Sequence, residues 1–295
     1  MKTTFRMMGL ADYITICNGL LGVMAIVFIL LAVDDMSEPY YQGGLLTDYI
    51  WWAMLCILLS AFGDIIDGPI ARRWSKQQIL GGSLDIMSDC VSFCVAPAIM
   101  IFAMFGRMGE ATPLWTFMLA VSCFWIIACG MLRLSRFQHE KGGDVNYFNG
   151  LSTPASAMLL LSAAGLIWLQ PSSGIGPEIS SWECNICWGS GKDKPYFDFI
   201  LLPLMFFCGA MMISDRKMSK LKSRMLLRLS MIQFISILFG IIHALTLTHS
   251  KDAAEDLSGT SFTIFLFTVS FVMTFLYIVG GPKFVDIENT LQMED

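Results

Sequence analysis

The chain has 295 residues, of which 55% are hydrophobic and 15% are charged, and its mean hydropathy is +0.63. These values exclude an ordinary soluble domain and indicate a polytopic membrane protein. The formal net charge is −5, and we expect no nucleic-acid partner.

Eight apolar runs are long enough to cross the hydrocarbon core of a bilayer, which is about 30 Å thick. They lie near 13–33, 46–66, 84–105, 113–135, 153–169, 197–214, 226–247 and 261–279. Backbone groups in lipid must be hydrogen-bonded within their own segment, and the runs lack the polar and apolar alternation of a membrane β-barrel. The sequence therefore predicts an all-α polytopic membrane helix bundle with about eight transmembrane helices.

The segment before the first run, residues 1–10, carries Lys2 and Arg6 among apolar side chains. It is either a short N-terminal interfacial helix or a frayed tail. The first run is too long for a signal-peptide core and no small-residue cleavage site follows it, so we expect it to be retained.

Lysine and arginine are unevenly distributed over the predicted loops. If the N-terminus is cytoplasmic, the opposite face holds only Arg107, Lys192, Lys194 and Lys251. Because Lys and Arg accumulate in short cytoplasmic loops, we expect both termini and the loop after the second span to be cytoplasmic. The basic stretch 216–228 either follows the same rule or binds anionic lipid headgroups.

Four carboxylates surround the predicted connection between the second and third spans. The chain reads Asp64-Ile-Ile-Asp67-Gly68-Pro-Ile-Ala71-Arg72, then eight residues, then Gly81-x-x-x-Asp85-x-x-x-Asp89. Within each predicted helix the carboxylates are three or four residues apart, so each pair shares a helix face. Four carboxylates at a membrane edge require cations or water. Hard oxygen ligands without a neighbouring His or Cys favour Mg²⁺ or Mn²⁺, and two such ions could bridge a diphosphate.

Small and basic residues accompany these carboxylates. Gly68 and Ala71 either let a nucleotide approach the backbone or allow close helix packing. Arg72 is a candidate phosphate clamp, because charge-assisted hydrogen bonds to phosphate are strong. In the first span, Thr15 and Asn18 are candidates for nucleotide or diphosphate contacts, with an interhelical hydrogen bond as the alternative.

The long loop at about 170–196 contains a pair of cysteines, Cys184 and Cys187. A structural zinc site would need two more ligands at matching spacing, and the sequence offers none. We expect a local disulfide or two free thiols.

The spacing of the four carboxylates resembles the signature of the CDP-alcohol phosphotransferase family, integral membrane enzymes that move a substituted phosphate from a CDP-linked donor onto an alcohol. The sequence from Asp85 to Ala98 is similar to the third helix of the phosphatidylserine synthase branch, and further similarities lie at 15–18, 133–137, 148–154 and 212–214. The resemblance spans most of 12–225 and departs from the branch at Cys94, Ser135 and Ser152.

The resemblance implies transfer of a phosphatidyl or archaetidyl group from CDP-diacylglycerol or CDP-archaeol to the hydroxyl of L-serine, with release of CMP. It implies one domain over 1–295, with the catalytic core at about 12–225 and additional C-terminal helices at about 226–279. It also implies a homodimer. The distribution of lysine and arginine described above predicts that the active site of this cell-membrane protein faces the cytoplasm.

Residue roles follow from the same resemblance. Asp89 is the expected general base, and the expected ligands of the Mg²⁺ or Mn²⁺ ions are Asp64, Asp67, Asp85 and Asp89. The expected nucleotide and diphosphate contacts are Asp64, Gly68, Ala71, Arg72, Gly81, Asn18 and Thr15. Arg133 and Arg136 either bind the serine carboxylate or extend to the membrane interface as ordinary flanking cations.

Two other interpretations stay open. The same transferase chemistry could use inositol phosphate or glycerol phosphate as the acceptor, which would call for additional convergent cations. A membrane transporter could also have eight spans, but its carboxylates should lie near mid-span on interrupted helices in repeated halves.

Overall fold

The structure, a computed structural model, describes residues 9–33, 47–74, 81–106, 113–140, 147–169, 200–219, 224–249 and 257–294. Its helices are α1 (Leu10–Ala32), α2 (Thr47–Trp74), α3 (Gly81–Asp89), the π-helix η3 (Cys90–Val95), α4 (Ala96–Phe105), α5 (Pro113–Glu140), α6 (Thr153–Trp168), α7 (Leu201–Ile213), α8 (Arg224–His249) and α9 (Leu257–Glu294). Two short strands, β1 (Tyr147–Asn149) and β2 (Lys217–Ser219), complete the described elements.

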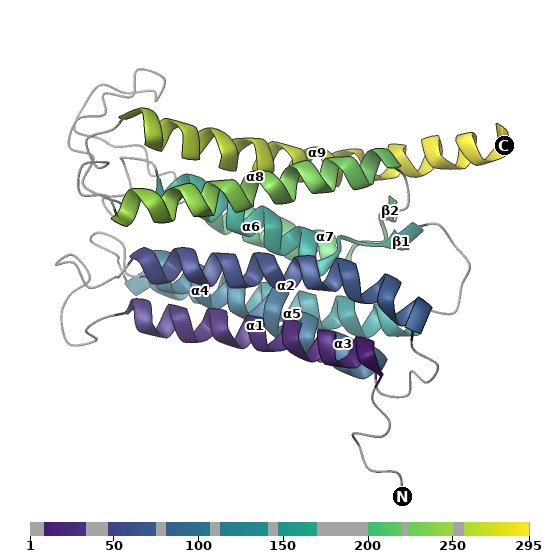
Figure 1. The fold of residues 1–295 in the computed structure, drawn as a ribbon, viewed down its shortest axis with the longest axis horizontal. Helices are drawn as coiled ribbons and strands as arrows, with labels where there is room; N and C mark the ends of the chain where they lie inside the picture. Colours follow the sequence, from purple (N-terminus) through teal and green to yellow (C-terminus); the bar gives the residue numbers. More distant parts are fainter. Residues whose placement is uncertain are drawn as a thin grey trace, which may run out of the picture.

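The helices run back and forth along a common direction, with α3, η3 and α4 forming one continuous rod (Figure 1). The start of α1, the end of α2, the start of α3 and both strands lie at the same end of the bundle (Figure 1). We call it the ribbon end, after the two-stranded ribbon that β1 and β2 form there. The helix α9 also ends on this side and extends beyond the rest of the bundle (Figure 1).

Six of the helical rods are long and apolar enough to cross a membrane, which identifies a multi-pass membrane protein. They are Asp12–Ala32, Asp48–Ile66, Gly81–Phe105, Pro113–Gln138, Arg228–Thr246 and Ser261–Gly281. The predicted spans at 153–169 and 197–214 correspond to the shorter apolar helices α6 and α7, so helix length confirms six of the eight predicted spans and leaves these two as a prediction. The predicted interfacial helix falls almost entirely on residues 1–8, outside the described part of the chain.

The short helix α6 is surrounded by protein. Thirteen of its residues are buried, and its 16 residues rise only about 24 Å against a hydrocarbon core of about 30 Å. A helix enclosed by other helices has no need to match the thickness of the lipid. Its side chains pack against α7 and α9, which explains why an apolar run of this length is stable inside the bundle.

The helix α1 packs very closely against the rod formed by α3 and η3. A methyl group built on Gly22 would lie 2.4 Å from the hydroxyl of Ser92, and one built on Gly19 would lie 3.3 Å from the hydroxyl of Ser88. Small residues allow this approach, and they are the residues on which helix association in membranes depends.

Hydrogen bonds from serine hydroxyl groups stabilise the same interface. Ser60 of α2 and Ser92 of η3 each donate a hydrogen bond of 3.0 Å to the main-chain carbonyl of Asn18 in α1. Ser88 of α3 donates a bond of 2.9 Å to the carbonyl of Thr15. Two segments that are distant in sequence, α2 and the rod of α3 and η3, are thereby fixed to one turn of α1.

The π-helix η3 is a feature that the sequence analysis did not predict, since it treated 84–105 as one regular span. The N–H of Ala96 bonds to the carbonyl of Val91, five residues earlier, in place of the usual four. Pro97 follows directly and has no N–H to donate, and its ring would press on the carbonyl of Phe93 in a regular α-helix. The wider π turn removes this conflict.

The antiparallel ribbon of β1 and β2 is also absent from the sequence-based expectation of helices alone. Its register pairs Tyr147 with Ser219, Phe148 with Met218 and Asn149 with Lys217. Gly150 follows with a φ of 79°, and a methyl group on it would lie 2.4 Å from the carbonyl of Met212, so this turn requires glycine. The ribbon joins the connection between α5 and α6 to the end of α7.

Replacement of Gly22 by alanine tests the close approach of α1 and η3. The added methyl group must displace Ser92, so Gly22→Ala should lower the free energy of unfolding by about 1–3 kcal/mol, measured by thermal unfolding in detergent. Gly82→Ala is the matched control, because no heavy atom lies within 4 Å of its added methyl group. Equal melting temperatures for the two variants would contradict the contact.

Candidate functional site

Three carboxylates from two helices meet at the ribbon end. Asp64 of α2 and Asp85 and Asp89 of α3 each offer one oxygen atom, and these atoms all lie within 4.8 Å of one another. All three side chains are half-buried. Carboxylate oxygens are the ligands that Mg²⁺ and Mn²⁺ prefer, so the cluster is chemically suited to such an ion.

The neighbours of these carboxylates in sequence anchor them to α1. Gly63, which precedes Asp64, leaves space that the Asn18 side chain fills, since a methyl group on Gly63 would lie 1.9 Å from the Asn18 Oδ1 atom. Ser88, which precedes Asp89, donates its hydroxyl to α1 as described above. The separation of Asp64 from Asp89 is therefore set by how α1 packs against both helices.

A buried arginine faces the carboxylate cluster. Arg133 of α5 is only 7% exposed, and its guanidinium lies within electrostatic range of the Asp89 and Asp64 carboxylates. The guanidinium also lies over the ring of Phe137, 5.2 Å from the ring centre. A charge at this depth is expensive unless opposite charges compensate it, and here the carboxylates offset part of that cost.

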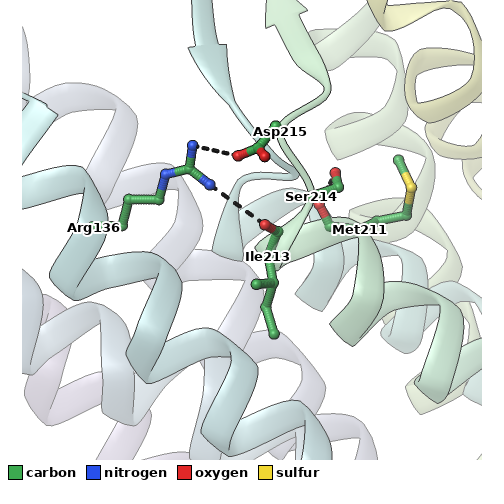
Figure 2. Close-up of polar contacts among 5 residues, drawn as sticks. All are labelled: Arg136, Met211, Ile213, Ser214 and Asp215. Carbon is green, nitrogen blue, oxygen red and sulfur yellow. Dashed lines mark hydrogen bonds and ion pairs between the residues drawn. The ribbon is translucent and has the colours of Figure 1, made fainter.

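Arg136, one turn further along α5, has a different environment. Its Nη2 atom lies 2.7 Å from the Oδ1 atom of Asp215, and its Nη1 atom donates to the carbonyl of Ile213 at 3.4 Å. Figure 2 shows the guanidinium directed at the end of α7, where both partners lie. The Asp215 side chain is 88% exposed, and ion pairs this exposed are worth at most about 1 kcal/mol.

Asp12 is a buried carboxylate that the sequence analysis missed. It is 2% exposed, accepts the N–H of Gly9 at 2.8 Å, and its Oδ1 atom would lie 2.9 Å from a methyl group on Gly81. The sequence signal was the acidic residue in the first turn of α1, where it can cap the helix. The start of α3 at Gly81 is therefore packed directly against the start of α1.

The remaining predicted site residues divide into two groups. Thr15 and Asn18 are buried, and their main-chain carbonyls take part in the interhelical hydrogen bonds described above. The backbone of Asp67, Gly68, Ala71 and Arg72 lies in the last turns of α2, whereas their side chains fall outside the described part of the structure. Cys184 and Cys187 also fall outside it.

The family described as CDP-alcohol phosphatidyltransferase matches residues 8–189 of this chain. The chain is similar to the CDP-diacylglycerol–serine O-phosphatidyltransferase of Saccharomyces cerevisiae, with 31% identity over 220 residues, or 69% of this chain and 68% of the relative. It is also similar to the archaetidylserine synthase of Methanothermobacter thermautotrophicus, with 32% identity over 163 residues, or 55% of this chain and 60% of the relative. The CDP-diacylglycerol–serine O-phosphatidyltransferase of Methanocaldococcus jannaschii is 30% identical over 162 residues, or 55% of this chain and 63% of the relative.

Binding of Mn²⁺ to the purified protein tests the carboxylate cluster independently of activity. Loss of a residue that only supports a metal ligand commonly weakens binding by about 10–100-fold, so Asp64→Asn, Asp85→Asn and Asp89→Asn should each weaken it by at least about tenfold. Electron paramagnetic resonance of free Mn²⁺ measures the affinity. Asp215→Asn removes an exposed carboxylate at the same end and should leave the affinity unchanged. Wild-type affinity in all three cluster variants would exclude this cluster as the metal site.

Proposed function

Because this chain belongs to the CDP-alcohol phosphatidyltransferase family, we propose that it transfers a phosphatidyl or archaetidyl group from a CDP-lipid to the hydroxyl of L-serine and releases CMP. The names of the similar proteins support serine as the acceptor. The observation that carries the proposal is the buried guanidinium of Arg133 beside the cluster of Asp64, Asp85 and Asp89. Serine has a hydroxyl group to be deprotonated and a carboxylate to be bound, and these two groups complement a carboxylate base and a cation.

Divalent cations fit the donor set of this site. We propose that Asp64, Asp85 and Asp89, together with Asp67, hold one or two Mg²⁺ or Mn²⁺ ions. The three described carboxylates would repel one another without a cation, which is a physical reason for the fit. When bound, such ions neutralise the charge on the diphosphate of the donor and on the departing phosphate.

The proposed chemical step moves one proton and exchanges one bond. Asp89 accepts the proton of the serine hydroxyl, the hydroxyl oxygen forms a bond to the lipid-bearing phosphorus, and the bond from that phosphorus to the CMP oxygen breaks. The electron pair of the broken bond leaves with CMP. Asp89 is suited to this role because it directly follows Ser88. Ser88 is buried and hydrogen-bonded to α1, which limits the movement of Asp89.

Arg133 and Arg136 are the proposed contacts of the serine carboxylate. Arg133 is the stronger candidate, since it is buried at the same place as the cluster, whereas Arg136 already pairs with Asp215. A planar guanidinium can donate two parallel hydrogen bonds to a carboxylate, which a lysine cannot do.

The proposed nucleotide contacts come from three helices, α1, α2 and α3. They are Thr15, Asn18, Gly68, Ala71, Arg72 and Gly81, together with Asp64. The hydrogen bonds from Ser60, Ser88 and Ser92 end on the main-chain carbonyls of Thr15 and Asn18, and the Asn18 side chain packs against Gly63, the residue before Asp64.

Steady-state kinetics with a panel of labelled acceptors tests the acceptor assignment. Wild-type protein with a CDP-lipid and a divalent ion should consume serine, and Arg133→Ala should raise the KM for serine by roughly one to two orders of magnitude. The KM for the CDP-lipid should change much less. Arg133→Lys should restore serine binding only in part.

Arg228→Ala removes an exposed arginine of α8 and is the matched control, which should behave as wild type. Unchanged dependence on serine in Arg133→Ala would show that another group binds the carboxylate. Consumption of a phosphorylated alcohol in place of serine would overturn the acceptor assignment and leave the transferase chemistry intact.

We further propose that the ribbon end faces the cytoplasm, since the basic loops belong to this end. A cysteine placed at Lys76 or Lys220 should react with an impermeant thiol reagent only after cells are broken. A cysteine placed at Lys192 should react in intact cells, above the background of the parent chain. The reverse pattern of labelling would overturn the orientation and the cytoplasmic supply of serine.

A further inference from the structure

The C-terminal helix α9 lies outside the part of the chain that the family matches. The match ends at residue 189, whereas α9 spans Leu257–Glu294. It nevertheless packs against α6, α8 and strand β2, and Figure 1 shows it passing the ribbon at the ribbon end. Its inward face is a buried stripe that contains Phe267, Ser270, Thr274 and Ile278.

Two contacts fix α9 to the segment that follows α7. The Nη2 atom of Arg216 donates a hydrogen bond to the carbonyl of Val279. Gly281 packs against Met218 of β2 so closely that a methyl group on it would lie 2.4 Å from the Met218 Sδ atom. The position of residues 216–218 therefore depends on α9.

The same segment holds Arg136. The carbonyl of Ile213 and the carboxylate of Asp215 both bind its guanidinium, as Figure 2 shows. The carbonyl of Arg216 also accepts the N–H of Gly150 at 2.9 Å, which closes the ribbon onto this segment. A continuous series of contacts thus leads from Val279 of α9 to Arg136 of α5.

A second route leads from α9 to Arg133. Tyr277 is partly buried against the core and lies one helical turn before Gly281, on the face that meets the ribbon. Its hydroxyl lies within electrostatic range of the Arg133 guanidinium. A phenol can donate a hydrogen bond to a carboxylate and accept one from a cation, so it complements an arginine that binds an anionic group.

We propose that α9 is part of the acceptor side of the active site, with Tyr277 as an acceptor-binding residue beside Arg133 and with Arg216 and Gly281 as positioning residues for Arg136. This inference rests on the proposed function in one respect, namely that Arg133 and Arg136 bind the acceptor. It assigns to a helix beyond the family match a direct part in the choice of acceptor.

Tyr277→Phe and Arg216→Gln test the two routes in the full-length protein. Tyr277→Phe removes the phenol hydroxyl, and Arg216→Gln replaces the guanidinium with a shorter, uncharged amide, so the KM for the acceptor should rise about three- to tenfold while the KM for the CDP-lipid stays within about twofold. Arg216→Lys retains a charged donor of similar length and should recover most of the acceptor affinity. Tyr49→Phe, in which a partly buried tyrosine stacked on Phe28 loses the same oxygen, and Val272→Ala, which shortens an exposed side chain of α9, are the matched controls.

A compensating pair separates positioning from general damage to the fold. Gly281→Leu should push Met218 aside and raise the KM for the acceptor, and Gly281→Leu combined with Met218→Ala should lower it again. The affinity for Mn²⁺, measured in the same samples, should stay at the wild-type value throughout. An unchanged acceptor KM in both Tyr277→Phe and Arg216→Gln, or a parallel loss of Mn²⁺ affinity, would overturn the proposal.

The acceptor panel on the wild type distinguishes this failure from failure of the proposed function. If the wild type consumes another alcohol in place of serine, the serine assignment fails, yet Tyr277→Phe and Arg216→Gln should still raise the KM for that alcohol. If the wild type consumes serine and these variants do not affect its KM, the proposed function stands and the role of α9 fails.

Discussion

A single main-chain carbonyl, that of Asn18, accepts hydrogen bonds from hydroxyl groups on both helical rods that border the carboxylate site. In a bilayer the hydrophobic effect does not draw helices together, so close packing of small residues and interhelical hydrogen bonds must do so. This junction holds Asp64 and Asp89 near each other although their charges repel. The proposed metal chemistry therefore depends on contacts in α1 that involve no charged group.

The surface of the bundle agrees with a lipid environment. Large apolar side chains such as Leu20, Phe117 and Phe124 are exposed on the outer helices, and on a soluble protein so many would promote aggregation. The carboxylate cluster and the ion pair of Arg136 with Asp215 lie at the ribbon end, where water and substrates can reach them. Most of the helix α6 is buried inside the bundle, so its side chains have little surface to expose to lipid.

Local patterns in the sequence were enough to predict the helices, because an apolar run reports directly on membrane crossing and the carboxylate spacing reports on a helix face. Contacts between distant segments were not predictable in this way. The pairing of Arg136 with Asp215, and of β1 with β2, joins parts of the chain that share no periodic signal. The same holds for the hydroxyl of Ser92, whose partner carbonyl is set by helix packing alone.

The π turn of η3 divides the rod of α3, η3 and α4 into two helical halves, and it changes the rotation of α3 about the rod axis relative to α4. A regular α-helix rotates about 100° per residue, so the one residue that a π turn accommodates changes which face the carboxylates of α3 present relative to α4. Deleting one residue within Cys90–Val95 would restore a regular helix and turn Asp85 and Asp89 away from Asp64 unless α4 rotated in lipid. The turn therefore sets the angle at which the carboxylates of α3 face α2 for a given packing of α4 in the bundle.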